Sequence, residues 1–269
     1  MITFDENWQS NSWDPVREPL PEAPKVHRKI SLCTVCMGRL HDLMVTLPVN
    51  IYYNRDYPNL EFVVLNYSSP DRMDDWMRDY MMPYIAAGIL VYLHTTEPEF
   101  YTMSHSRNLA FKAATGAIVV NVDADNLIRR GFADLLNRLA ELRPAKAVFT
   151  VRNLAGQVGL YKSDWLELGG YDESLEGYGC EDVNIVSRAW VAGCKLMAWD
   201  HLQDQFWERM PTSNEDRVRY MECKHRYLTW FVNGKTTNRN LQRRQLVANE
   251  GRCWGKATLV KNFKETIQV

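Results

Sequence analysis

The sequence predicts an α/β protein whose mostly parallel sheet is flanked by helices. In the first half of the chain, short apolar runs alternate with segments of helical periodicity, an order that is typical of parallel sheets. Two carboxylates, Asp123 and Asp125, directly follow the apolar run 117–122. Because open α/β sheets bind ligands at the carboxyl ends of their strands, this pair indicates the edge that carries the site. Beyond Asn126 the alternation becomes irregular, which indicates a mixed second half.

The elements of the first half follow from the apolar runs and from the residues that end helices. The expected strands cover residues 30–37, 60–65, 89–93 and 117–122. The expected helices between them cover residues 39–53, 72–87 and 104–114. Gly88 and Gly116 lie just beyond the last two helices, where glycine readily ends a helix, and Pro48 could kink the first one. Crossover helices between successive strands require those strands to be parallel.

The second half is expected to be mixed and to end in a helical, basic extension. Its helices cover residues 131–142 and 181–192, and its short strands cover residues 147–151, 157–161 and 195–199. Ser213 or Asn214 could cap one last long helix, on which a shared face would carry Val218, Met221, His225, Leu228 and Val232. The chain is thus divided into an N-terminal extension (1–28), a first half (29–126), a second half (127–210) and a C-terminal extension (211–269).

The overall composition is ordinary for a globular protein, with a net charge of -1 and 46% hydrophobic residues. These values give no support for a nucleic-acid or membrane partner on global grounds. Residues 235–269 nevertheless contain eight basic and two acidic side chains, so the tail is a local cationic surface that is either solvated or a binding patch. No apolar run approaches the ~20 residues that span a bilayer, and we expect a cytoplasmic protein without a transmembrane segment.

The six cysteines are scattered along the chain, which fits free thiols in a reducing compartment. Cys33 and Cys36 form a CxxC pattern inside an apolar run. Residues three apart on a strand point to opposite faces of the sheet. We therefore favour two buried thiols over a zinc site or a redox pair.

Two acidic pairs could carry chemistry. Alternation along an extended chain puts Asp123 and Asp125 on the same side, so both can face one divalent cation. Glu181 and Asp182 start the expected helix 181–192, where the helix dipole stabilises a carboxylate and helps to keep it ionised. An ionised carboxylate can act as a base. Adjacent residues on a helix point in different directions, so these two acids should have different tasks.

Four ordered segments resemble family-2 glycosyltransferases of the GT-A fold. They are EFVVLNYSSPD (61–71), SHSRNLAFKAATG (104–116), GAIVVNVDADN (116–126) and GGYDESLEGYGCEDVNIVSRA (169–189), of which the last is similar to a galactosyltransferase segment. The resemblance covers roughly residues 29–205. It implies a GT-A sheet with a nucleotide-sugar-binding half and an acceptor-side half. The implied reaction moves a sugar from a nucleotide diphosphate sugar to a glycan or other hydroxyl acceptor, with inversion.

The same resemblance implies roles for the acidic residues. Asp125 would be a direct ligand of a manganese or magnesium ion, Asp123 would reach the ribose or the metal, and His201 would complete the metal shell. The cation would stabilise the charge that grows on the leaving diphosphate. Asp182 would remove the proton of the acceptor hydroxyl as general base, and Glu181 would hydrogen-bond an acceptor hydroxyl.

The resemblance also implies a nucleotide site. Its members would be Thr34, Cys36 and Arg39 near the base and ribose, Arg107 near the diphosphate, and Asn66, Ser68 and Ala124. Asn66 stands where the family usually has an aspartate that accepts a hydrogen bond from the uracil N3–H. Because an amide oxygen can also accept that bond, the UDP-sugar donor is weakly favoured.

A sugar or acceptor pocket is implied by the glycine-rich segment before the second acidic pair. Its members would be Trp165, Gly170, Tyr171, Tyr178 and Gly179. Aromatic rings offer flat faces to a sugar and glycines allow its close approach, although aromatic residues near glycines also pack cores.

Two other functions remain open at this stage. The basic, aromatic-bearing tail could guide a polyanion, such as hydroxymethylated DNA, to the site. The chain could also be a catalytically silent module that binds a nucleotide sugar or a glycan. The combination of Asp125, Asp182 and His201 argues against a silent module.

Overall fold

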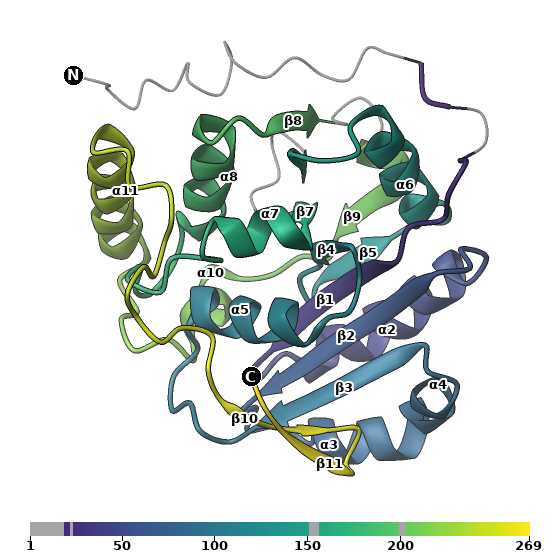
Figure 1. Ribbon diagram of the computed structural model, residues 1–269. Helices are drawn as coiled ribbons and strands as arrows, with labels where there is room; N and C mark the ends of the chain where they lie inside the picture. Colours follow the sequence, from purple (N-terminus) through teal and green to yellow (C-terminus); the bar gives the residue numbers. More distant parts are fainter. Residues whose placement is uncertain (1–18, 22–23, 151–155, 199–202) are drawn as a thin grey trace.

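The computed structural model describes residues 19–21, 24–150, 156–198 and 203–269. Its centre is a nine-stranded sheet with the order β11-β10-β3-β2-β1-β4-β7-β6-β8 (Figure 1). These strands are β1 (Ile30–Cys36), β2 (Leu60–Tyr67), β3 (Leu90–Thr95), β4 (Ile118–Asn121), β6 (Ala147–Thr150), β7 (Val158–Tyr161), β8 (Lys195–Ala198), β10 (Thr258–Lys261) and β11 (Glu265–Gln268). A separate two-stranded sheet pairs β5 (Asn126–Ile128) with β9 (Trp207–Arg209).

The pairing confirms the predicted α/β fold with a parallel first half and a mixed second half. Strands β1 and β2, β2 and β3, and β1 and β4 are parallel. Strand β7 is antiparallel to both β4 and β6, whereas β6 and β8 are parallel. The first reversed strand, β7, therefore lies beside β4, the strand that the two carboxylates follow.

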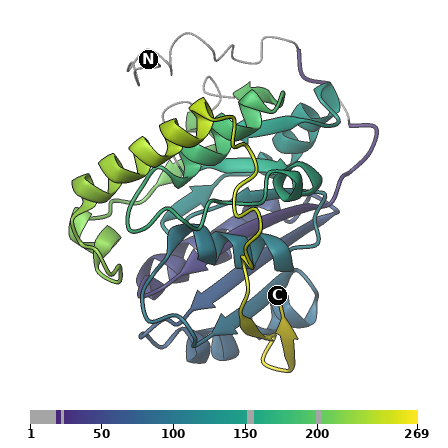
Figure 2. The ribbon, with the colours of Figure 1, turned by 60° about the vertical axis from the view of Figure 1, so that its left-hand side comes forward.

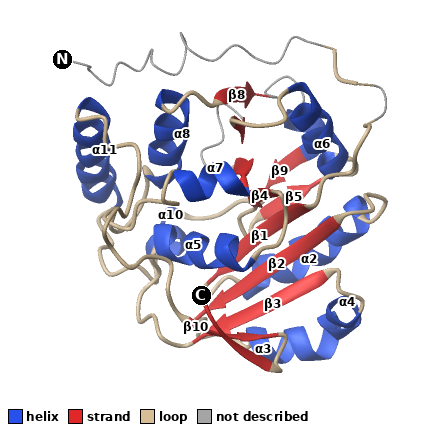
Figure 3. Ribbon diagram, viewed as in Figure 1, coloured by secondary structure: helices blue, strands red, loops and turns tan. Residues whose placement is uncertain are grey.

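Helices cover both faces of the sheet (Figure 3). They are α2 (Leu40–Asn54), α3 (Met73–Trp76), the π-helical turn η1 (Met77–Met81), α4 (Met82–Ala86), α5 (Met103–Ala113), α6 (Phe132–Leu142), α7 (Lys162–Glu167), α8 (Glu181–Val191), α9 (Gln203–Phe206), α10 (Asn214–Val218) and α11 (Arg226–Gln242). None of the helices in these described ranges is long and apolar enough to cross a membrane.

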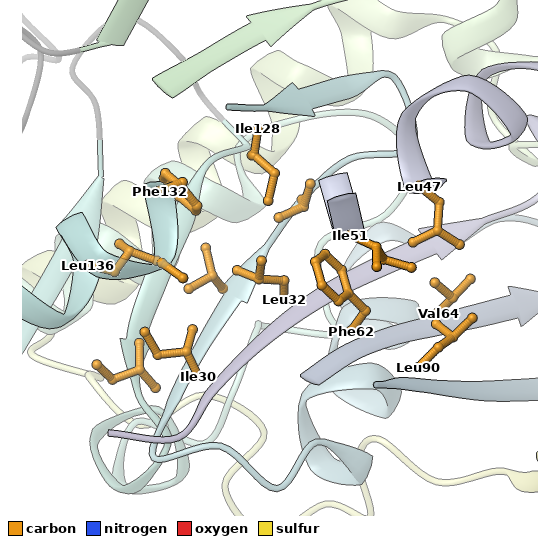
Figure 4. Packing of buried hydrophobic residues seen from close by; sticks show 14 of the residues in the cluster. Ile30, Leu32, Leu47, Ile51, Phe62, Val64, Leu90, Ile128, Phe132 and Leu136 are labelled. Carbon is orange, nitrogen blue, oxygen red and sulfur yellow. The ribbon is translucent and has the colours of Figure 1, made fainter. Parts of the chain in front are cut away.

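Two hydrophobic cores lie on the two sides of the sheet because successive strand residues point to opposite faces. One core packs strand residues such as Leu32 and Phe62 against α2 and α6 (Figure 4). The other packs the opposite strand face against α5, α7 and α8. Cys36 belongs to the first core and Cys33 to the second, and both are free thiols. The expected burial of the CxxC pair on opposite faces is confirmed.

The prediction of one long helix after Ser213 is wrong. The Ser213 hydroxyl does cap a helix, because it accepts a hydrogen bond from the Asp216 amide at 3.0 Å, but that helix, α10, ends at Val218. The next residues turn inward: the Tyr220 carbonyl accepts a hydrogen bond from the Tyr101 amide at 2.7 Å. Helix α11 begins only at Arg226. The expected helical extension is thus two helices, and it is followed by β10 and β11, which the sequence analysis did not anticipate.

Candidate active site

A cleft of about 500 Å³ opens beyond the carboxyl ends of β1 and β4 and is bounded on its far side by the start of α8 and by residues from α10 and α11. It brings together nine of the residues that the sequence analysis singled out. They are Arg39, Arg107, Asp123, Ala124, Asp125, Tyr178, Gly179, Glu181 and Asp182. Two acidic pairs that lie more than fifty positions apart in the chain therefore face one space.

Arg107 joins the two acidic pairs. Its side chain projects from α5 and is only 1% exposed. One terminal nitrogen donates to Glu181 at 2.7 Å and to Asp182 at 2.6 Å, and the other donates to Asp123 at 3.3 Å. Charge-assisted hydrogen bonds as short as those to Glu181 and Asp182 fix side chains firmly. The guanidinium thus sets the distance between the carboxylate after β4 and the carboxylates that begin α8.

The charges around Arg107 are not balanced, since one cation faces the three carboxyl groups of Glu181, Asp182 and Asp123. Burial raises the pKa of the Asp182 carboxyl well above its ordinary value, Arg107 opposes this rise, and the neighbouring Glu181 adds to it. The expectation that the helix N-terminus keeps Asp182 ionised is thus outweighed by burial. We infer that Asp182 retains its proton more strongly than an exposed acid would.

The turn into α8 depends on backbone conformations that glycine favours. Gly179 has a φ of 91°, and a Cβ atom built there would lie 2.8 Å from the Trp230 ring. Cys180, the N-cap residue, has a φ of 71°, a left-handed conformation that is uncommon for a residue with a side chain. This tight turn aims the first residues of α8 into the cleft.

Asp125 is buried among hydrogen-bonding partners. Its carboxylate accepts from Asn126 at 2.7 Å and from the Thr212 hydroxyl at 2.8 Å, and it lies 3.5 Å from Arg39 and 4.0 Å from Arg217. The carboxyl group is 5% exposed. These partners balance its charge in the structure described.

Asp123 is the more open carboxylate of the pair, with a side chain that is 29% exposed. One oxygen accepts from Asn121 at 2.8 Å, and the other lies 3.8 Å from Arg209. Carboxylate oxygens suit manganese or magnesium, whose remaining ligands can be phosphate oxygens and water. The two aspartates therefore fit a divalent cation by their chemistry, although the described residues contain no cluster of three or more potential metal-ligating side chains. His201, the expected third ligand, lies outside the described residues.

Asn66, at the end of β2, is held in a network of its own. Its amide nitrogen donates to Asp74 and to the Tyr92 hydroxyl, both at 2.9 Å, and its oxygen accepts from the Ser69 amide at 2.9 Å. Burial opposes ionisation of Asp74, but hydrogen bonds from His94, Tyr92 and Asn66 outweigh it and lower the pKa of Asp74 to about 2. The network fixes which way the Asn66 amide points.

Several expected nucleotide and sugar residues do not line the cleft. Thr34 and Cys36 are buried in β1, and Ser68 lies beyond β2 with a φ of 53°. Trp165 and Tyr171 are fully buried and pack on Phe111 in the second core. Gly170 lies close to Asn108 and Trp254, so a side chain there would clash. Of the expected sugar pocket, the structure brings only Tyr178 and Gly179 to the cleft.

The far wall of the cleft was not predicted from the sequence. This wall is contributed by residues 209–230, including Arg209, Thr212, Arg217, Tyr220, Arg226 and Trp230. The segment reaches the acidic pair because β9 pairs with β5 and because the Met210 amide donates to the Asp125 carbonyl at 2.8 Å. The density of arginine and aromatic residues in this segment was the available signal.

Comparisons with known proteins agree with this architecture. Residues 49–233 match the family model described as Glycosyl transferase family 2. None of the curated protein sequences compared matches the chain.

Similar solved structures include the mannosyltransferase PcManGT from Pyrobaculum calidifontis in complex with GDP-Man and Mn2+, with a TM-score of 0.56 and 21% identity over 68% of this chain and 58% of that chain. S. aureus TarS 1-349 has a TM-score of 0.61 and 13% identity over 82% of this chain and 66% of that chain. Its complex with UDP-GlcNAc has a TM-score of 0.56 and 14% identity over 80% of this chain and 73% of that chain. The chain therefore covers less than two thirds of the first two structures.

Proposed function

Because this chain belongs to glycosyl transferase family 2, we propose that it moves a sugar from a nucleotide diphosphate sugar to an acceptor hydroxyl with inversion of the anomeric centre. The observation that carries the proposal is the single cleft in which Arg107 links Asp123 to Glu181 and Asp182. One acidic pair lies at the strand end where a donor's diphosphate would bind. The other lies across the cleft, where an acceptor would enter.

The donor side would be formed by Asp123 and Asp125. These two residues would hold a manganese or magnesium ion, which supplies Lewis-acid stabilisation of the leaving diphosphate when it is bound. The Mn2+ in the PcManGT complex supports this part of the proposal. His201 remains a proposed third ligand. A UDP-sugar remains weakly favoured as the donor, because the Asn66 oxygen has a second lone pair that can accept the uracil N3–H, but Asn66 is 2% exposed and does not line the cleft, so a uracil would need an opening at the end of β2.

The acceptor side would be formed by Asp182 and Glu181. Asp182 would take the proton of the acceptor hydroxyl while the hydroxyl oxygen attacks the anomeric carbon, and Glu181 would hydrogen-bond the acceptor. A carboxyl group with a raised pKa is a stronger base once it is ionised, so burial of Asp182 favours this role. Arg107 would keep the base at a fixed distance from the donor side, which supplies orientation.

The proposal is tested by incubating the purified chain with UDP- and GDP-sugars in the presence of Mn2+, with and without EDTA. We expect metal-dependent release of nucleoside diphosphate from one class of donor, and a transferred sugar of inverted configuration once an acceptor is found. Binding of a donor without any release of nucleoside diphosphate would identify a silent binding module. Retained configuration in the product would overturn the role of Asp182.

A further inference from the structure

Helix α11 is attached to the protein by its polar side. Thr229, Asn233 and Thr237 are its buried residues, and the Thr237 side chain is fully enclosed. The Asn233 amide donates to the carbonyl of Gly179 at 2.9 Å, and the Asn184 amide donates to the Thr237 hydroxyl at 3.1 Å. A surface helix normally buries its apolar stripe and exposes its polar one. In α11 this arrangement is reversed.

The outward side of the first two turns of α11 is apolar. We call the four side chains there the α11 outer face: Tyr227, Leu228, Phe231 and Val232 are 80%, 57%, 53% and 51% exposed. They lie on the same side of the helix because their spacing follows its period. Figure 2 shows α11 running along the outside of the molecule, away from the central sheet. Contiguous exposed apolar side chains of this size mark an interaction surface.

The charges on α11 indicate which kind of partner would bind the α11 outer face. The range Arg226–Gln242 contains no aspartate or glutamate. Lys235 and Arg239 follow the apolar turns on the same side, and Arg243 and Arg244 continue the positive charge. If two copies of α11 packed together, their basic residues would repel each other. An anionic lipid surface would instead attract the basic residues and accommodate the apolar ones. We propose that the α11 outer face docks on an anionic phospholipid bilayer, with α11 lying on the bilayer surface.

Because α11 borders the cleft, docking of α11 would also affect access to the active site. Arg226 and Trp230, on its first turns, line the catalytic cleft. Next to the same turns, a second hollow of about 610 Å³ is lined by Val218, Tyr227 and Leu228, among others. Docking would therefore bring the cleft to the lipid surface, where an acceptor with a hydroxyl head and an apolar tail could reach it. This choice of acceptor rests on the proposed function, whereas the docking does not.

The docking is tested by co-sedimentation of the full chain with vesicles, without nucleotide sugar. Vesicles of phosphatidylcholine alone are compared with vesicles that also contain phosphatidylglycerol. Leu228→Gln combined with Phe231→Gln should weaken binding at least ~10-fold, since both side chains lose apolar burial. Lys235→Gln combined with Arg239→Gln should weaken binding to the anionic vesicles by about 30-fold at low salt and have little effect on neutral vesicles.

Matched variants elsewhere on the surface provide the controls. Tyr52→Gln combined with Tyr80→Gln removes two tyrosines that are 58% and 66% exposed, and Lys195→Gln combined with Lys264→Gln removes two exposed lysines. Both pairs should bind vesicles like the unmodified chain. Circular dichroism melting should show that all variants remain folded.

Several results would overturn the docking proposal. One is the absence of binding to anionic vesicles at low salt, and another is an equal loss in the control variants. A chain that binds duplex DNA but no vesicles would show that the face recognises a different polyanion. A dimer that the Leu228 and Phe231 changes dissociate, without vesicle binding, would show that a second copy covers the face. Donor cleavage measured in parallel would separate failure of the docking from failure of the proposed function.

Discussion

Replacing Arg107 with methionine tests the charge arrangement of the cleft directly. The guanidinium is 1% exposed and contacts three carboxyl groups, so its removal leaves those groups without their shared cation. Breaking a buried ion pair by removing one partner costs about 3–5 kcal/mol. We therefore expect Arg107→Met to lower the free energy of unfolding by an amount in that range at neutral pH.

The loss should depend on pH in a definite direction. Arg107 lowers the pKa of Asp182 in the native protein, so without it the Asp182 pKa should rise further above the value in the unfolded chain. A native state that binds more protons than the unfolded state loses stability as pH rises, by up to about 1.4 kcal/mol per pH unit for each extra proton. The extra loss of the variant therefore grows by up to about 1.4 kcal/mol per pH unit over the pH range in which Asp182 is ionised in the unmodified native protein but still protonated in the variant.

Urea unfolding at pH 5, 6.5 and 8 measures this dependence, with Arg188→Met as the control. Arg188 is also 1% exposed, but its hydrogen-bond partners are the amide oxygen of Asn184 and the carbonyls of Leu168 and Gly170, among others. Burial lowers the pKa of Arg188 to about 10, which is still above the tested range. Its loss should be large but constant with pH. If Arg107→Met followed the same flat profile, Arg107 would not control the protonation of Asp182 between pH 5 and pH 8.

Three further predictions concern single carboxyl groups. Asp182→Asn should leave donor binding intact and lower transfer by about 10²–10⁴-fold. It should also remove the limb of the pH–rate profile that rises as Asp182 loses its proton, and retention of that limb would reject the base assignment. Asp123→Ala should abolish Mn2+-dependent donor binding in calorimetry without unfolding the chain, whereas Asp125→Ala should also lower the melting temperature because its buried partners lose their acceptor. Asp74, whose pKa is lowered to about 2, should stabilise the fold above about pH 4 and lose this effect as the pH falls toward 2. Asp74→Asn should accordingly cost about 1 kcal/mol at pH 7, after allowance for solvent screening, and less at pH 3.

Most of the first half could be predicted because its signals are local. Strands β1, β2 and β4 are buried along nearly their whole length and therefore appear as continuous apolar runs. Strands β10 and β11 carry no such signal, because each has four residues and most of them are partly or fully exposed. Strand β10 is held by pairing with β3, far away in the chain. Pairing of that kind cannot be inferred from a local pattern.

The last long helix was predicted wrongly because apolar residues with one helical spacing lie in two different environments. Met221 is 1% exposed and packs inside, whereas Leu228 and Val232 are more than half exposed. Periodicity shows which residues share a side of a helix, but it does not show whether that side faces the core. The buried side of α11 is formed by threonine and asparagine, which the hydrophobic pattern did not mark.

The acidic residues of the site could be predicted because each lies at the end of a locally visible element. Asp123 follows a buried strand, and Asp182 begins a helix after a glycine-rich turn. The partners of Arg107 could not be predicted, since a guanidinium binds phosphate and carboxylate by the same geometry. The aromatic residues were ambiguous for a related reason. Tyr171 and Tyr178 both neighbour glycines, yet Tyr171 is in the core and Tyr178 lines the cleft.

The balance of charge in the cleft leads to a last prediction. Its described lining includes five arginines (Arg39, Arg107, Arg209, Arg217 and Arg226) and five carboxyl groups (Asp123, Asp125, Glu181, Asp182 and Asp216). A nucleotide diphosphate sugar is an anion and a divalent cation neutralises it, so the two together leave the net charge of the cleft unchanged, whereas either alone changes it. We therefore expect donor and Mn2+ to bind cooperatively, each lowering the dissociation constant of the other by the same factor. Calorimetric titration of donor at several Mn2+ concentrations measures that factor, and a factor of one would show that the carboxylates and arginines of the cleft act independently.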